Sequence, residues 1–325
     1  ASVVCAFSTS IESLIAMRFL QALGGCAGMV AAQTLIRDLF PTNRTAQAFS
    51  SITLVIAVSP MIAPTVGGYL TTSLGWPSVF VVLAAITFVI VCAVYFVLPE
   101  GRKADSSISL KPQHVVRNFI TVIREPQFIK YALAGGIAMS APFAYIAASA
   151  HVFMSVYGFT EQQFGWVFAI IASGLIGSAQ FNHLLLKYFS SQQLVRYALT
   201  FQVVFGLLLC AAVYFDWVNG VMLTAMVFIF FTGQGLTGPN STALALAPFT
   251  KHTGSAASLL GSFRMAIGGL VTVAVSAWHT QDALPMVVTM VMCVVTGLFI
   301  LGFGKLVVLY KARKREVEEE PSVLM

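Results

Sequence analysis

Two arginine residues lie inside apolar stretches of the sequence, where a charged side chain can bind ions or polar ligands. Arg18 follows Ser13 by five residues and Arg264 follows Ser255 by nine, so Arg264 is about 14 Å into its helix. A charge in hydrocarbon is costly unless it meets water or a partner, and such residues mark ion and substrate pathways. We expect both arginines to serve function; the alternative is that helix-end carbonyls hold them, or that they reach the membrane surface.

Arg18 belongs to a stripe of polar and small residues on one helix face. The members are three or four residues apart, which places them on the same side of a helix: Arg18, Gln21, Gly25, Gly28 and Ala32. We expect Arg18 and Gln21 to line a polar cavity. The small residues would let a neighbouring helix approach closely, as this spacing does in membranes.

The next apolar segment contains the run SPMIAPTVGG, from Ser59 to Gly68. Pro60 and Pro64 each remove a backbone hydrogen bond, and Gly67 with Gly68 permits close packing. The run therefore predicts a bent helix. Kinking alone explains these residues, and a role in transport is the alternative.

Further polar side chains lie within apolar segments of the second half of the chain: Tyr145, Ser149, Gln234, Thr237, Asn240 and Arg264. Polar groups in a membrane face water or ligand, or they bond neighbouring helices. As a set they predict a substrate cavity, in which Tyr145 offers an aromatic face to an apolar cation. For each residue alone, a bond between helices is the alternative.

Membrane-spanning helices must position these residues, because the composition excludes a soluble fold. The 325 residues are 58% apolar and 9% charged, with a mean hydropathy of +0.87, whereas soluble domains are about 25% charged. Nine full spans are predicted, at 13–36, 47–72, 77–98, 127–155, 162–186, 194–215, 218–247, 255–278 and 285–308. Residues 1–8 are too short to cross a bilayer, and we expect them to be the tail of a preceding span.

The sequence gives no support for enzymatic or metal chemistry. It contains no HExxH or GxSG motif and no pair of carboxylates inside a predicted span. Its five cysteines lie in apolar runs without CxxC or Cys/His spacing. We therefore expect no enzyme activity, no catalytic residue, no metal site and no cofactor.

The basic residues predict the orientation of the chain, because cytoplasmic loops carry the excess of Lys and Arg. Sixteen of the 18 fall in one set of loops and none in the opposite set, so the C-terminus and the polar stretch 99–126 are predicted to be cytoplasmic. The net charge of +6 then reflects topology and anionic lipid headgroups, not nucleic-acid binding. Within 99–126 we expect an amphipathic helix on the inner leaflet; a solvated linker is the alternative.

A weak internal repeat occurs at an offset of 209 residues. Residues 19–48 match 228–257 at five positions, including Gly24 with Gly233 and Phe40 with Phe249. Membrane transporters are commonly built from repeated helical units. If the second unit begins near Phe128, the first would begin about 80 residues before Ala1, by the offset of 209. On this interpretation the chain lacks two helices and most of a third.

Two motifs carry a family resemblance. The run RFLQALGGCAG, from Arg18 to Gly28, resembles the fourth-helix motif of the major facilitator superfamily, and APTVGG, from Ala63 to Gly68, resembles its fifth-helix antiporter motif GPxxGG. The wording VSPMIAPTVGGYL, with RDLFP at Arg37 to Pro41, is similar to the Bcr/CflA branch of drug:proton antiporters. Ala63 departs from the motif, which usually has Gly there.

The resemblance implies an all-α membrane protein with the major facilitator fold, in which this chain supplies helices 4–12 and the tail of helix 3. The expected domains are an incomplete N-terminal bundle, a linker with an interfacial helix, a C-terminal six-helix bundle and a tail, at 1–98, 99–126, 127–310 and 311–325. We expect the multi-pass chain to lie in the inner membrane as a monomer among lipids.

The function implied is proton-coupled efflux of small amphipathic drugs by alternating access, which confers antibiotic resistance. Arg18 and Gln21 would serve coupling, and Pro60, Pro64, Gly67 and Gly68 helix bending. No Asp or Glu lies well inside a span of this sequence, so a coupling carboxylate would come from the absent helices. A carrier for a single metabolite, such as a sugar or amino acid, and a non-functional fragment are the alternatives.

Overall fold

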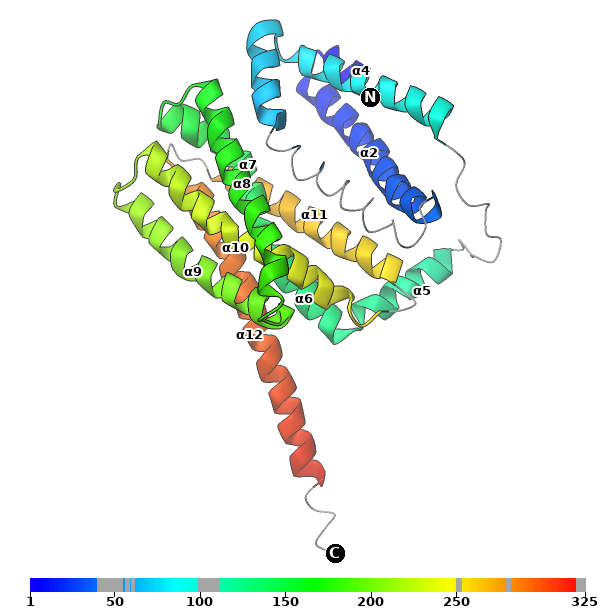
Figure 1. The fold of residues 1–325 in the computed structure, drawn as a ribbon, viewed down its shortest axis with the longest axis vertical. Helices are drawn as coiled ribbons and strands as arrows, with labels where there is room; N and C mark the ends of the chain where they lie inside the picture. The colour runs from blue at the N-terminus through cyan, green and yellow to red at the C-terminus, as the bar shows by residue number, and fades with distance from the viewer. Residues whose placement is uncertain are drawn as a thin grey trace, which may run out of the picture. The chain divides into compact units, whose positions relative to one another are not determined.

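The computed structural model describes residues 1–39, 55, 59, 62–98, 112–249, 253–278 and 282–319. The regular elements in these ranges are helices (Figure 1), so the prediction of an all-α fold is confirmed. In chain order they are α1 (Ser2–Ala6), α2 (Ile11–Leu39), residues 62–74, α4 (Pro77–Val97), α5 (Pro112–Ile123), α6 (Pro126–Ala138), α7 (Ala141–Ala150), η1 (His151–Val156), α8 (Glu161–Leu185), α9 (Ser191–Tyr214), α10 (Gly220–Leu246), α11 (Thr253–Ala277) and α12 (Leu284–Glu319).

Seven stretches of the described chain are long and apolar enough to cross a membrane. They are Pro77–Val97, Pro126–Val156, Glu161–Leu185, Ser191–Tyr214, Gly220–Leu246, Gly254–Ala277 and Leu284–Gly302. Each overlaps one predicted span, so the prediction of a multi-pass membrane protein is confirmed. Of the other two predicted spans, 13–36 lies within the helix α2, and 47–72 lies partly outside the described residues.

The chain divides into two compact units, of which unit 1 comprises Ala1–Ile108 and Glu161–Ala169. In it, α1 contacts α2 and α4, and its Cys5 side chain is fully buried. The first turns of α8 approach the helix at 62–74. A Cβ atom added to Gly165 would lie 2.9 Å from Oγ1 of Thr65, so the absence of a side chain permits this contact.

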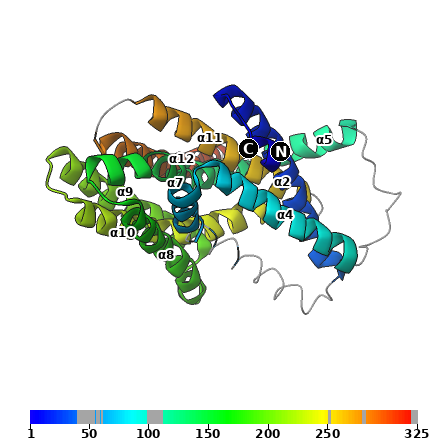
Figure 2. The same ribbon diagram turned by 90° about the horizontal axis from the view of Figure 1, so that it is seen from above.

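Unit 2 comprises Ser109–Thr160 and Ile170–Met325. Its helix α10 contacts α9 and α6, and α12 also contacts both α6 and α9; Figures 1 and 2 show α9 and α10 side by side. Helix α11 packs against α7, α6 and α5. Glycines let these backbones approach, as at Gly297 of α12, where an added Cβ would lie 2.7 Å from the carbonyl oxygen of Ala134 in α6.

The predicted amphipathic helix is present as α5. Val122 on one face is fully buried in a cluster with Phe128, Ala245 and Leu260, which fixes α5 to α6, α10 and α11. Val116 on another face is 54% exposed. The helix thus has one apolar side for unit 2 and another that points outward, and its location on the lipid surface stays a prediction.

One predicted span, 127–155, is divided into α6, α7 and the π-helix η1. Pro142 near the start of α7 has no amide hydrogen, so the carbonyl of Ala138 loses the donor that a continuous helix would supply. In η1 the turns are wider, and the Tyr157 amide donates to the Val152 carbonyl, five residues back, at 3.1 Å. Gly158 follows with a φ of +70°, which favours glycine.

Helix α12 is longer than predicted. It continues without a break from Leu284 to Glu319, whereas the sequence predicts a span that ends at 308. Figure 1 shows its C-terminal part projecting beyond the other helices of unit 2. Most of the predicted C-terminal tail is therefore helical up to Glu319.

We predict that Gly297→Ala destabilises unit 2, because its methyl group would press on the backbone of α6 at Ala134. Overpacking of this kind costs about 1–3 kcal/mol. Gly302→Ala is the control on the same helix, since an added Cβ there meets nothing within 4 Å. Unfolding of the detergent-solubilised protein by SDS should show a lower free energy of unfolding for Gly297→Ala alone. Equal stability of both variants would contradict the packing described.

Candidate functional site

Polar side chains of α10, from Gln234 to Thr242, bond four other helices of unit 2, and we call this set the α10 polar network. Its first member, Gln234, is fully buried and donates from Nε2 to the carbonyl oxygen of Ala138 in α6, at 2.7 Å. That carbonyl is the one that Pro142 leaves without a donor. The side chain of α10 therefore replaces the missing backbone bond at the break between α6 and α7.

Two further members bond α9 and α8. The Thr237 hydroxyl lies 3.5 Å from Oε1 of Gln202 in α9, and Gln202 donates from Nε2 to the carbonyl of Phe230 at 3.2 Å. Asn240 donates from Nδ2 to Oδ1 of Asn182 in α8 at 2.6 Å. These four amide and hydroxyl side chains are all buried, so each bond joins two helices away from water.

Arg264 bonds α10 from α11. Its Nη2 donates to Oγ1 of Thr242 at 2.8 Å and lies 3.5 Å from Oγ of Ser241. Both hydroxyls donate their own hydrogen to the Gly238 carbonyl, at 2.7 and 3.1 Å, so their lone pairs are free to accept from the guanidinium. An added Cβ at Gly136 of α6 would come within 3.8 Å of the Arg264 side chain, so α6 leaves room for it.

Arg264 differs from the other predicted cavity residues in exposure and in hydrogen bonding. It is half-buried, whereas Gln234 and Asn240 are at most 2% exposed. Its buried Nε has no hydrogen-bond partner in the described part of the chain, and the same holds for Oε1 of Gln234. Buried polar atoms without a protein partner are positions where water or a ligand binds.

Tyr145 and Ser149 lie on α7 and are also buried, at 2% and 1% exposure. The Tyr145 ring meets Phe231 of α10 edge to face, with ring centroids 5.5 Å apart. The structure therefore brings Tyr145, Gln234, Asn240 and Arg264 to one helix, α10. Ser149 follows Tyr145 by one turn on α7.

In unit 1, Arg18 and Gln21 lie together as their spacing predicts. Nη1 of Arg18 donates to Oε1 of Gln21, whose Nε2 donates to Oγ of Ser2 in α1 at 2.6 Å. The Arg18 guanidinium also lies over the Phe80 ring of α4, 5.8 Å from its centroid. Two hydrogen bonds and one cation–π contact thus connect α2 with α1 and α4.

The antiporter-like run is only partly described, and Pro60 lies outside the described residues. Pro64, Gly67 and Gly68 lie in the helix at 62–74. The carbonyls of Gly67 and Gly68 accept from the Thr71 and Thr72 hydroxyls, at 2.8 and 2.9 Å. Threonine hydroxyls that bond carbonyls one turn back often bend helices, which agrees with the bend that the prolines predict.

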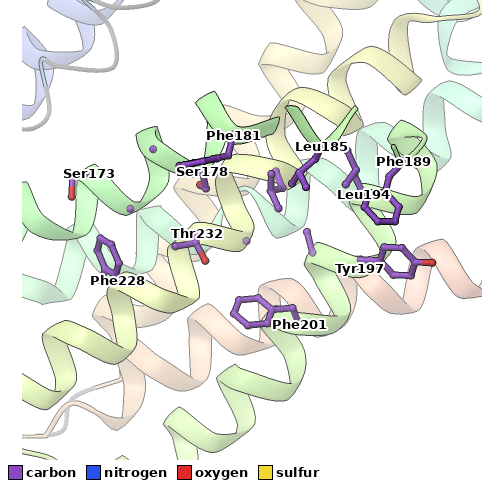
Figure 3. Close-up of a pocket in the computed structure, with 15 residues that line it drawn as sticks. Ser173, Ser178, Phe181, Leu185, Phe189, Leu194, Tyr197, Phe201, Phe228 and Thr232 are labelled. Carbon is purple, nitrogen blue, oxygen red and sulfur yellow. The ribbon is translucent and has the colours of Figure 1, made fainter. Parts of the chain in front are cut away.

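An apolar groove of about 560 Å³ opens between α8, α9 and α10, and we call it the aromatic groove. Figure 3 shows Phe181 from α8, Tyr197 and Phe201 from α9, and Phe228 and Thr232 from α10 around it. Its volume lies within the range of pockets for small molecules. With no charged residue among its described lining, it can hold only an apolar group or chain.

Comparison with known proteins decides the family. The model of the Major Facilitator Superfamily matches residues 1–273. The chain belongs to the Major Facilitator Superfamily. It is a membrane transporter of small molecules, and not an enzyme.

The similarity to the Bcr/CflA branch that the motifs indicate is confirmed. A bicyclomycin resistance protein homologue of Haemophilus influenzae is 29% identical over 295 residues, which are 90% of this chain and 74% of that protein. Multidrug resistance protein D of Escherichia coli is 28% identical over 283 residues, 86% of this chain and 70% of that protein.

Solved structures of major facilitator proteins share the fold. A bacterial homologue of the human lysosomal transporter Spinster, in an inward-facing and unoccupied conformation, matches with a TM-score of 0.64 and 14% sequence identity. The match covers 93% of this chain and 78% of that one. The predicted major facilitator fold is thereby confirmed.

Sequence reasoning missed part of this major facilitator site. Asn182 and Gln202, which bond Asn240 and Thr237, were not among the predicted residues, although an amide inside an apolar span is a signal that could have found them. The aromatic groove was also missed. Its residues are ordinary apolar residues of membrane helices, so nothing in the sequence marks them.

Proposed function

We propose that the chain is a secondary active transporter that exports small amphipathic compounds in exchange for protons, by alternating access. Relatives named for bicyclomycin resistance and multidrug resistance support the substrate class. The observation that carries the proposal is that Arg18 and Arg264 are held by neutral groups: an amide and an aromatic ring for Arg18, and two hydroxyls for Arg264.

An arginine held in this way has its positive charge available for another group. A carboxylate that approaches it is favoured in the ionised form, and protonation of that carboxylate weakens the attraction. The same change of affinity lets a proton and a substrate exclude one another at one site. Arg18 with Gln21 would serve this coupling, Arg264 would face substrate, and the prolines and glycines around Pro64 would bend their helix during the change of access.

The proposal includes a location and a domain organisation. The chain would lie as a monomer in the inner membrane, with its C-terminus and the linker 99–126 on the cytoplasmic side. The bundles would be 1–98 and 127–310, and the tail 311–325. The concentration of basic residues in one set of loops supports this orientation.

Everted membrane vesicles test the coupling. Vesicles that contain the chain should lose part of a preformed pH gradient when a cationic amphipathic compound is added, and vesicles without it should not. Arg18→Lys should retain membrane expression but respond roughly tenfold less, because Lys lacks the fork of donors that holds Gln21. Glu12→Gln, at the exposed start of the same helix, is the control. A response to sugars or amino acids alone would contradict drug efflux, and an unchanged Arg18→Lys response would contradict the coupling role.

Substrate choice should depend on the charge of Arg264. Arg264→Gln should change the ratio of resistance to cationic and neutral compounds by roughly tenfold, the effect of about 1.4 kcal/mol, at equal expression. Thr242→Val removes the hydroxyl that Arg264 binds but keeps the charge, so it should preserve that ratio. A proportional loss for all compounds in both variants would mean that Arg264 has a structural role only.

A further inference from the structure

A second hollow of unit 2, of about 800 Å³, lies between α6, α9 and α12, and we call it the cationic cleft. Its lining includes Lys130 of α6, Arg196 and Thr200 of α9, and Leu298 and Leu301 of α12. Lys130 and Arg196 come within the first two turns of their helices, and the apolar stretch of α12 ends at Gly302. All three helices therefore contribute the end of a membrane span, so the cleft lies at a membrane surface.

The charges that line the cleft are all positive. Lys130 and Arg196 are its two ionic residues, and its described lining contains no Asp or Glu. The Lys130 ammonium lies over the Tyr131 ring, 5.5 Å from the centroid, and Gln193 at the rim accepts from the backbone amide of Ser190 at 2.9 Å. Two cations beside partly ordered polar neighbours at a membrane surface fit an anionic group.

The order of residues along α9 fits the shape of a phospholipid. Arg196, Thr200 and Val204 follow one another at intervals of four and so lie on one face of the helix. Val204 and the next residues on this side, Leu207 and Leu208, are each 57% exposed. Polar and charged groups thus give way to exposed apolar ones about 12 Å deeper, as a headgroup gives way to acyl chains.

We propose that the cationic cleft binds the headgroup of an anionic phospholipid, whose phosphate meets Lys130 and Arg196 and whose chains lie along Val204, Leu207 and Leu208. A soluble phosphate compound would use the cations only and would gain nothing from the exposed apolar face. This site is separate from the α10 polar network, so the proposal does not depend on the substrate or on proton coupling.

The test measures the thermal unfolding midpoint of the 325-residue chain in a non-ionic detergent. Phosphatidylglycerol should raise the midpoint by several degrees more than phosphatidylcholine with the same chains, and soluble glycerol 3-phosphate should leave it unchanged. The double variant Lys130→Gln with Arg196→Gln should lose most of the difference between the two lipids. Lys187→Gln is the matched control, because Lys187 is an exposed cation after α8 that does not line the cleft.

Each lipid comparison is made within one variant, so a variant of low intrinsic stability still gives a result. If the double variant fails to fold, Arg196→Gln alone carries the test, because Arg196 is exposed. Equal shifts with both lipids, an undiminished difference in the cleft variants, or an equal loss in Lys187→Gln would each overturn the proposal. A shift with glycerol 3-phosphate as large as that with phosphatidylglycerol would assign the cleft to a soluble ligand instead.

Discussion

A polar side chain inside a membrane must bond another protein group or trapped water, because hydrocarbon offers no hydrogen-bonding partner. Unit 2 meets this requirement around one helix. Gln234, Thr237, Asn240 and Thr242 of α10 point to α6, α9, α8 and α11 in turn. A rotation of α10 about its axis would break several of these bonds together, so the polar residues fix how the surrounding helices are oriented.

Small residues make these bonds possible because side-chain amides and hydroxyls are short. A Cβ added to Gly233 would overlap the Gln202 side chain, and one added to Gly235 would overlap Ser178 of α8. Glycine therefore holds α10 close to its neighbours at the positions where they exchange hydrogen bonds. The break at Pro142 belongs to the same arrangement, since it creates the free carbonyl that Gln234 binds.

The sequence predicts the helices of this protein well and their partners less well. Apolar run length locates the spans, and spacing places Arg18 beside Gln21, because both signals are local. The contacts of Asn240 with Asn182 join residues far apart in the chain, and no local pattern encodes them. The division of the span 127–155 was missed for a related reason: Pro142 could have produced only a kink, and the donor that compensates for it lies on α10.

The central claim is that the α11 face bearing Arg264 borders a water-filled substrate path, whereas the buried polar residues hold the bundle together. Single cysteines in a background without the five native ones test it most directly. Gly261, one turn from Arg264 on the same side, has open space beside it, and Ala266 is exposed on the opposite side. We predict that a membrane-impermeant maleimide labels Gly261→Cys, that an exported compound slows this labelling, and that Ala266→Cys is unlabelled. Equal labelling at both positions, or none at Gly261→Cys, would contradict the account.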